Sequence, residues 1–255
     1  MKNKIKKMSP IKVEKCYRTS RLVFVIMSLS LLIATVYFGV QKLDFIMYIS
    51  FFLACVLVIL YPLYLWQFLQ GLLCMATEEL DPLRAIQSMS NIKADKGDWA
   101  FINYSYLYLI LGEFGRSHDY LARIKVKKLQ GKYLVSFWFI SNFLSILQGQ
   151  ELDSDVFRQK MESGKFRTTR EKSLAHEKFQ VLQAISDIES GQVNSYFETA
   201  EAKNNLDKLI YQFYQAKNQV LLGNADKAKE LFATVAHSNN DIYFVQKARE
   251  YLKEK

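Results

Sequence analysis

The sequence predicts an all-α protein, in which an N-terminal transmembrane helical hairpin is followed by an α-solenoid of antiparallel helix pairs. Two apolar runs, residues 22–40 and 45–69, are separated by only four residues. After them, residues 70–255 contain one proline and almost no alternation of apolar and polar residues, which disfavours β-strands. Glycines that follow apolar segments recur at spacings of 37, 42 and 32 residues, and such a period is typical of stacked helix pairs.

Residues 1–21 are predicted to form a basic cytoplasmic tail. They carry eight lysines and arginines, against the single acidic residue Glu14. Basic residues next to a span are retained on the cytoplasmic side of a membrane, and they attract anionic lipid headgroups. The candidate contacts with anionic lipid are Lys2, Lys4, Lys6, Lys7, Lys12, Lys15, Arg18 and Arg21.

Each apolar run is long enough to cross a membrane once as a helix. A hydrocarbon core of ~30 Å needs about 20 apolar residues, and the backbone in lipid must satisfy its own hydrogen bonds. Two crossings return the chain to its starting side, so we expect both termini in the cytoplasm and residues 70–77 as a membrane-proximal connector. The alternative is that residues 22–40 belong to a cleaved signal peptide, but this run is long for one and a second run follows at once.

The charge distribution disfavours nucleic acid as a partner. The chain has a net charge of +9, of which residues 1–21 contribute +7. Residues 70–255 hold 25 lysines and arginines against 23 acidic residues, so they lack the basic excess typical of nucleic-acid binding. We therefore expect the lipid bilayer to be the counterpart of the basic tail. Frequent lysine and asparagine with few prolines favours a bacterial plasma membrane.

Residues 78–255 are predicted to form a helical domain on the cytoplasmic side. Asp81 followed by Pro82 is a typical helix start, because aspartate caps free backbone amides and proline suits the first turn. Glycines favour the left-handed conformation that ends a helix. The glycines expected to end helices in this way are Gly112, Gly149, Gly191 and Gly223. The helix after the second of these glycines is expected to begin at Asp153 or Ser154.

One segment, residues 211–236, resembles a tetratricopeptide repeat (TPR). The matching small, glycine, small and aromatic positions are Ala216, Gly223, Ala228 and Phe232. The match is partial, because the aromatic residue and leucine expected in the first helix fall on Gln212 and Gln215. We extend the TPR-like resemblance over residues 78–255 as one good repeat and three degenerate ones, with residues 242–252 as a capping helix. An irregular helical bundle is the alternative.

The resemblance implies a concave groove lined by the first helix of each pair. Aligning each turn glycine with the family's glycine places mainly apolar and aromatic side chains at the inward positions. The candidate groove residues are Trp99, Ile102, Tyr106, Phe139, Phe143, Phe213 and Lys217. Such a groove would accept an amphipathic helix or apolar segment of a protein or peptide partner. The lysine and asparagine clamp with which some family members hold a peptide carboxylate is absent, and the alternative is that these rings belong to the core.

The sequence carries no pattern typical of catalysis, metal binding or cofactor binding. Its three histidines are far apart, and Ser117-His118-Asp119 are sequence neighbours, whereas a catalytic triad must converge in space. We therefore expect no enzyme and no cofactor, and a membrane-anchored adaptor is the leading hypothesis. The alternatives are an accessory or regulatory subunit of a membrane transporter, secretion or signalling complex, engaged through the hairpin, and a membrane-bound enzyme without a recognisable motif. The oligomeric state is left open.

Overall fold

Every regular element is a helix in the computed structural model, which describes residues 1–94, 96–150, 152, 155, 159, 166, 168–238 and 241–254. The all-α prediction is confirmed for these residues. The first α-helices are Lys2–Ile5 (α1), Pro10–Val40 (α2), Asp44–Thr77 (α3), Pro82–Asn91 (α4), Asp98–Ile110 (α5) and Phe114–Ala122 (α6). After the 3₁₀ helix Val126–Lys128 (η1) come Gly131–Leu147 (α7), Thr169–Glu189 (α9), Tyr196–Thr199 (α10), Asn205–Leu221 (α11), Ala225–Ala236 (α12) and Tyr243–Glu254 (α13).

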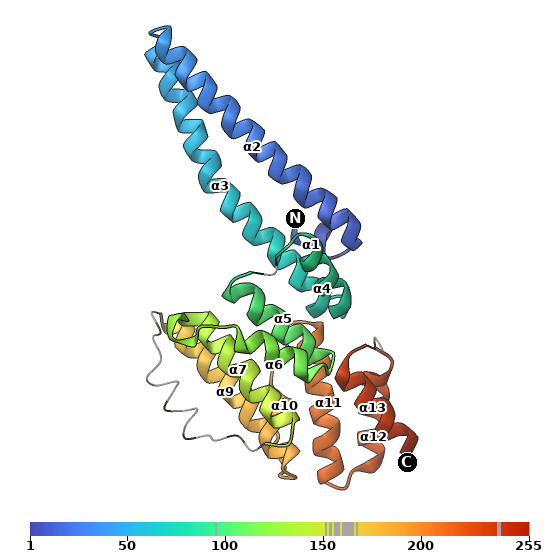
Figure 1. Ribbon diagram of the computed structural model, residues 1–255. Coiled ribbons are helices and arrows are strands. Elements are labelled where there is room, and N and C mark those ends of the chain that lie inside the picture. Colours follow the sequence, from blue (N-terminus) through green and yellow to red (C-terminus); the bar gives the residue numbers. More distant parts are fainter. Residues whose placement is uncertain are drawn as a thin grey trace.

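Helices α2 and α3 form an antiparallel arm that projects from a bundle made of the later helices (Figure 1). At ~1.5 Å per residue, their 31 and 34 residues extend for about 46 and 51 Å, which exceeds a hydrocarbon core of ~30 Å. Val13 is the only buried residue of α2, and the buried residues of α3 before Phe68 are Ser50 and Ala54. Because their apolar stretches are exposed, these helices differ from the core helices of a soluble protein, and they are long and apolar enough to span a membrane.

The arm helices are longer than the predicted spans. The first begins at Pro10, within the predicted tail, and the second continues to Thr77 through the predicted connector. The predicted bounds of 22–40 and 45–69 therefore describe the apolar stretches but not the helices. Propensity explains the difference, because lysine, glutamate, leucine and methionine all favour a helix whether or not lipid surrounds it.

The base of the arm has a hydrophobic core of its own, which we call the base core. Its buried members come from five helices: Ile5 of α1, Val13 of α2, Phe68, Leu72, Met75 and Ala76 of α3, Ala85 and Met89 of α4, and Ala100, Tyr104 and Leu107 of α5, with Ile92 just after α4. This core crosses the predicted boundary at residue 78. The first 21 residues are therefore not a free tail, since Ile5 and Val13 are only 1% and 0% exposed.

The predicted helix ends are confirmed at the glycines. Gly112, Gly149, Gly191 and Gly223 have φ angles of +76°, +81°, +85° and +78°, in the left-handed region that glycine adopts most easily. Antiparallel helix pairs flank two of these glycines, α5 with α6 and α11 with α12. The predicted cap of α4 is also present, because the Asp81 side chain accepts a hydrogen bond from the backbone amide of Arg84 at 3.0 Å.

The contacts of the other helices do not confirm the expected order of stacking. Helix α9 pairs with α7, and the helix after Gly191 is α10, which has only four residues. The expected helix start at Asp153 or Ser154 lies outside the described residues. The last helix, α13, also contacts the first pair, α5 and α6. The ring centroids of Tyr243 in α13 and Phe114 in α6 are 5.2 Å apart. In an open solenoid each unit contacts only its neighbours, so this contact between the two ends is unexpected.

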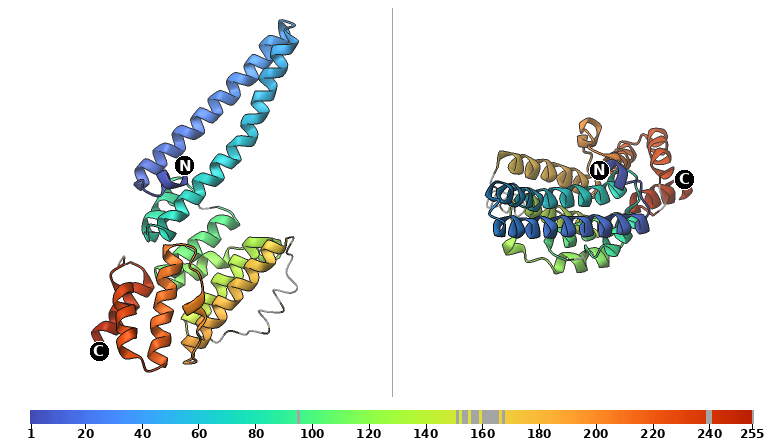
Figure 2. Two further views of the ribbon diagram at one scale, coloured as in Figure 1. Left: turned by 180° about the vertical axis from the view of Figure 1, so that it is seen from behind. Right: turned by 90° about the horizontal axis from the view of Figure 1, so that it is seen from above.

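Both chain ends lie on the bundle side of the arm. The N-terminus is at the base of the arm, and the C-terminus is at the far side of the bundle, as Figures 1 and 2 show from opposite sides. The turn between α2 and α3 forms the distal tip of the arm. If the arm spans a bilayer, residues 1–9 and the whole bundle are therefore on the same side of it.

Candidate functional site

The predicted groove residues do not form one continuous surface. Ile102, Tyr106 and Phe139 line one cavity, and Phe213 and Lys217 line another. We call the first the junction cavity, because it lies where the bundle meets the end of α3, and the second the C-terminal groove, because it lies between α9, α11, α12 and α13.

The remaining two candidates, Phe143 and Trp99, line neither cavity. Phe143 is 1% exposed, and its ring lies 5.6 Å from Phe139 and 6.0 Å from Phe244 between centroids. Trp99 packs against the base core. Helix α13 was expected to cap the stack, and its Phe244 is buried against the rings of Phe143 and Phe213.

The junction cavity has a volume of about 290 Å³. Its apolar lining is Ile102, Val135, Phe139, Ile140 and Leu174. Its polar lining is Thr77, Asn103, Tyr106, Ser136, Lys178, Lys203, Asn204 and Asp207. These residues come from α3, α5, α7, α9 and α11, with Lys203 and Asn204 just before α11, so the cavity touches five helices including the end of the arm. Cavities that combine an apolar wall with polar groups are typical of small-molecule sites.

Two opposite charges line the junction cavity without forming a direct ion pair. The Lys178 ammonium lies over the Phe139 ring, 4.5 Å from its centroid, and no ion pair within 4.0 Å joins it to Asp207. Burial lowers the pKa of Lys178, and the negative charge of Asp207 partly offsets this. Burial likewise raises the pKa of Asp207, and the positive charge of Lys178 opposes that shift. Each charge is therefore poorly solvated, and each is only partly compensated by the other.

The neighbouring polar groups hold Asp207 in place. Asn204 caps α11, because its Oδ1 accepts from the Asp207 backbone amide at 2.8 Å while its Nδ2 donates to Asp207 Oδ2 at 2.8 Å. Lys203 forms an ion pair with Glu177. Next to this cap, the Asn205 side chain donates to the backbone carbonyl of Glu78 at 2.6 Å, which ties the start of α11 to the end of the arm.

The C-terminal groove has a volume of about 320 Å³ and a mainly apolar lining. The lining residues are Ile188, Glu189, Phe213, Lys217, Val220, Leu221, Phe232, Tyr243, Lys247 and Tyr251. Both lysines are paired at the rim, Lys217 with Glu189 at 2.5 Å and Lys247 with Glu250 at 2.6 Å. The groove thus combines an apolar and aromatic floor with a charged edge.

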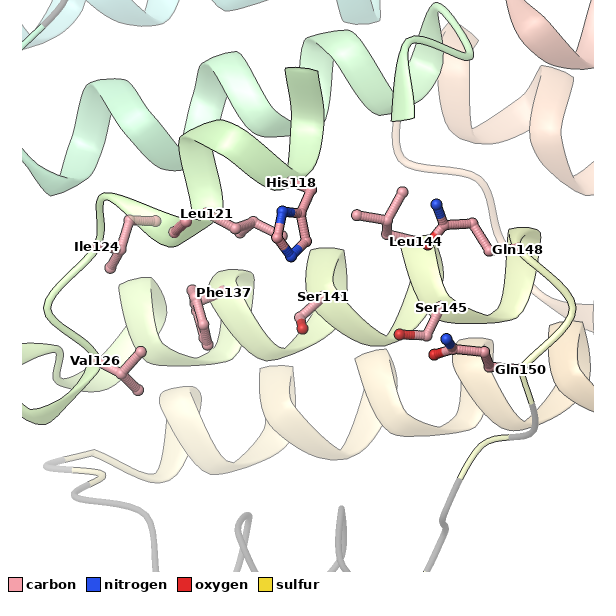
Figure 3. A pocket seen from close by; sticks show the side chains of 11 residues that line it. His118, Leu121, Ile124, Val126, Phe137, Ser141, Leu144, Ser145, Gln148 and Gln150 are labelled. Carbon is pink, nitrogen blue, oxygen red and sulfur yellow. The ribbon is translucent and has the colours of Figure 1, made fainter. Parts of the chain in front are cut away.

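A third pocket, of about 570 Å³, lies between α6 and α7 and is shown in Figure 3. His118 faces Ser141 there, but among the described residues no carboxylate lines the pocket to orient the imidazole as a catalytic base. Ser117 is buried and donates to the backbone carbonyl of Ser105 at 2.9 Å, so Ser117-His118-Asp119 do not converge. The pocket extends to Gln150, beyond which few residues are described, and we assign it no function.

The basic residues at the base of the arm are mostly exposed. Lys2, Lys4, Lys7, Lys12, Lys15, Arg18 and Arg21 are exposed, whereas Lys6 is half-buried. Lys6 pairs with Glu79 at 3.2 Å, and Arg18 pairs with Glu14 at 2.7 Å. Arg21 also lines a hollow of about 620 Å³ between α2 and α3, with Tyr17, Phe24 and Tyr61.

Among the described residues, no group of three or more His, Cys, Asp or Glu side chains is placed to hold a metal ion. The chain matches no protein-family model, no curated protein and no solved structure. The TPR-like resemblance is therefore carried only by the residues quoted for it, and function has to be argued from the geometry of this chain.

Sequence reasoning missed the opposite charges of Lys178 and Asp207 in the junction cavity. Asn204 and Asp207 show the spacing of a helix cap, which was a detectable signal. Lys178 offers no such signal, because it lies in α9 among many charged residues and only the packing of α7 against α9 turns it toward Phe139.

Proposed function

We propose that this chain is a membrane-anchored adaptor whose helical bundle binds a protein or peptide partner at the cytoplasmic face of a bacterial plasma membrane. The observation that carries the proposal is the C-terminal groove, an apolar and aromatic hollow in the part of the bundle farthest from the arm. A groove of this composition suits an amphipathic helix or an apolar segment of another protein.

The arm supports the membrane part of the proposal. It exposes two apolar stretches of the length of a bilayer, and exposed basic residues gather at its base. Because basic residues remain on the cytoplasmic side, the base of the arm and the bundle belong there. The same residues would contact anionic lipid headgroups, at ~1 kcal/mol for each residue near the surface.

The position of α11 supports the adaptor part. This helix begins next to the end of the arm, where Asn205 contacts Glu78, and ends at Leu221, about 24 Å farther along its axis. Leu221 lines the C-terminal groove and is 38% exposed. The groove is thus presented to the cell interior, away from the lipid.

The helix pair α11 and α12 also supports a TPR-like interpretation of this region. Ala216 and Ala228, at the small positions of the repeat pattern, are 0% exposed, and Phe232 is 2% exposed. Buried small residues allow two helices to cross closely, which is their role in such a repeat. We propose that this pair is a TPR-like repeat. For the rest of residues 78–255 we propose only a weaker likeness to such repeats.

Site-specific photocrosslinking tests the adaptor proposal. The full chain is expressed in its native host with the photoreactive residue benzoylphenylalanine in place of Leu221. In the control, the same residue replaces the exposed Glu230 of α12. We expect a discrete protein adduct from position 221 and none from position 230. If neither position gives an adduct, or both give the same ones, the groove is not the partner site.

The hollow between α2 and α3 favours a second candidate function. Its lining combines Arg21 with aromatic and aliphatic side chains from the middle part of the arm. A third transmembrane helix or a lipid would fill it, so the hairpin could engage a transporter, secretion or signalling protein as an accessory subunit. Crosslinking from Val58, which lines this hollow and is 66% exposed, would then capture a membrane protein.

A further inference from the structure

Three charged side chains line the junction cavity: Lys203 is paired with Glu177, whereas Lys178 and Asp207 do not form an ion pair with each other. The Lys178 ammonium forms no hydrogen bond with any described residue, and its closest recorded interaction is with the face of the Phe139 ring. Asp207 lines the same cavity and accepts a hydrogen bond from Asn204 Nδ2 at 2.8 Å. Poorly solvated charges are costly, and a bound group of opposite charge would reduce the cost at each of them.

The rest of the lining restricts what can bind. Ile102, Val135 and Ile140 give the cavity an apolar wall, and its volume of about 290 Å³ lies near the lower end of typical small-molecule sites. A suitable ligand is therefore small and carries both an anionic and a cationic group next to an apolar group.

We propose that the junction cavity binds a small zwitterion of the amino-acid class with an apolar side chain. The carboxylate of the ligand pairs with Lys178, its ammonium pairs with Asp207, and its side chain lies against Ile102 and Ile140. Charge-assisted hydrogen bonds of this kind are about twice as strong as neutral ones. This site is separate from the C-terminal groove, so it adds a small-molecule function to the adaptor.

Binding here would also couple the bundle to the arm. The cavity is lined by Thr77 at the end of α3 and by Asn204 at the start of α11, and the adjoining residues Glu78 and Asn205 are hydrogen-bonded. A ligand that contacts both helices stabilises their junction, and binding to the folded state raises the thermal midpoint.

The test uses the full chain in lipid nanodiscs and ¹⁹F NMR. The probes are 4-fluoro-L-phenylalanine, 4-fluorophenylacetate, which lacks the ammonium, and 4-fluorophenethylamine, which lacks the carboxylate. We expect saturable binding of the zwitterion and about tenfold weaker binding of each single-charge probe. Equal binding of the three probes, or no saturable binding of the zwitterion, overturns the proposal.

Three variants identify the contacts. Lys178→Met should weaken binding of the zwitterion about tenfold without affecting the amine, and Asp207→Asn should weaken it without affecting the acid. Lys208→Met, at an exposed neighbour outside the cavity, should bind as the parent does. Thermal midpoints check that the variants are folded. A folded Lys178→Met that binds the zwitterion as tightly as the parent contradicts the proposal.

Discussion

Single glycines control helix ends here, but their surroundings differ. A Cβ on Gly112 would lie 2.9 Å from Tyr243 Cδ2, whereas a Cβ on Gly223 would meet no atom within 4 Å. Both residues have positive φ, so alanine is strained at either position by about 1 kcal/mol. Only Gly112 adds a steric conflict to that strain.

We predict that Gly112→Ala lowers the thermal midpoint more than Gly223→Ala does. The difference should correspond to roughly 1 to 3 kcal/mol in the free energy of unfolding, which is the usual cost of overpacking. Circular dichroism of the full chain in detergent measures both midpoints. In a Tyr243→Ala background the difference should disappear, because the ring that meets the new methyl group is gone. Equal midpoints of the two alanine variants would show that α13 does not pack against the first helix pair.

Ala228 tests the close crossing of α11 and α12. It is 0% exposed, while its neighbours Lys227 and Lys229 are exposed. We predict that Ala228→Leu destabilises the chain by roughly 1 to 3 kcal/mol, because the extra carbons have no space. Lys227→Ala should change stability by less than about 0.5 kcal/mol. Chemical denaturation measures the free energy of unfolding of both variants. If Lys227→Ala is the more destabilised of the two, the TPR-like register of this pair is wrong.

At this scale the sequence predicted backbone better than side-chain surroundings. The four left-handed glycines follow from local chemistry, since a helix needs a particular residue at its end. The burial of Phe143 does not follow from local chemistry, because it depends on Phe244, which lies about one hundred residues later in the chain. A family resemblance orders helices along a stack, and it could not show that α13 returns to the first pair.

Among the helices, α1 shows how the N-terminal residues are held. Ile5 fits against Gly71 of α3 so closely that a Cβ there would lie 2.9 Å from Ile5 Cβ. The half-buried Lys6 strengthens the attachment through its pair with Glu79 and its backbone carbonyl, which accepts from Arg84 at 3.1 Å. These contacts keep the first basic residues at the base of the arm.

We predict that Gly71→Ala releases α1, because the Cβ of Ile5 cannot move without moving its backbone. Trypsin should then cut the full chain near its N-terminus faster than it cuts the parent. The matched control is Gly115→Ala, at an exposed helical glycine with no atom within 4 Å of the new Cβ, where alanine should stabilise the helix by up to ~1 kcal/mol. Unchanged cleavage of Gly71→Ala would mean that α1 is not docked on α3.

Helix type and order were predictable at this scale, but helix length and pairing were not. An apolar run shows which residues can contact lipid, but it does not show where the helix begins or ends. The helix start at Pro10 and the helix end at Thr77 were therefore missed. The pairing of α7 with α9 was missed for another reason. Glycine spacing reports where a chain turns, and it does not report which helix then packs against which.

Across the whole molecule, the arm and the bundle are joined rather than linked by a flexible connector. The base core includes residues from both, and the Asn205 contact with Glu78 adds a second attachment. A change at the junction cavity is therefore well placed to reach both the arm helices and the C-terminal groove. The sequence predicted the two parts from their composition, but not this shared core, because the residues that form it are separated by long stretches of chain.

The central claim is that the arm crosses a membrane and leaves the bundle on the cytoplasmic side. Single cysteines at Lys42, in the turn at the tip of the arm, and at Lys227, on the exposed face of α12, test it most directly in a chain whose native cysteines are serines. A membrane-impermeant maleimide is added either to intact cells or to cells that have first been lysed. We expect Lys42→Cys to react before lysis and Lys227→Cys to react only after it. Reaction of Lys227→Cys in intact cells while Lys42→Cys stays protected would contradict the account.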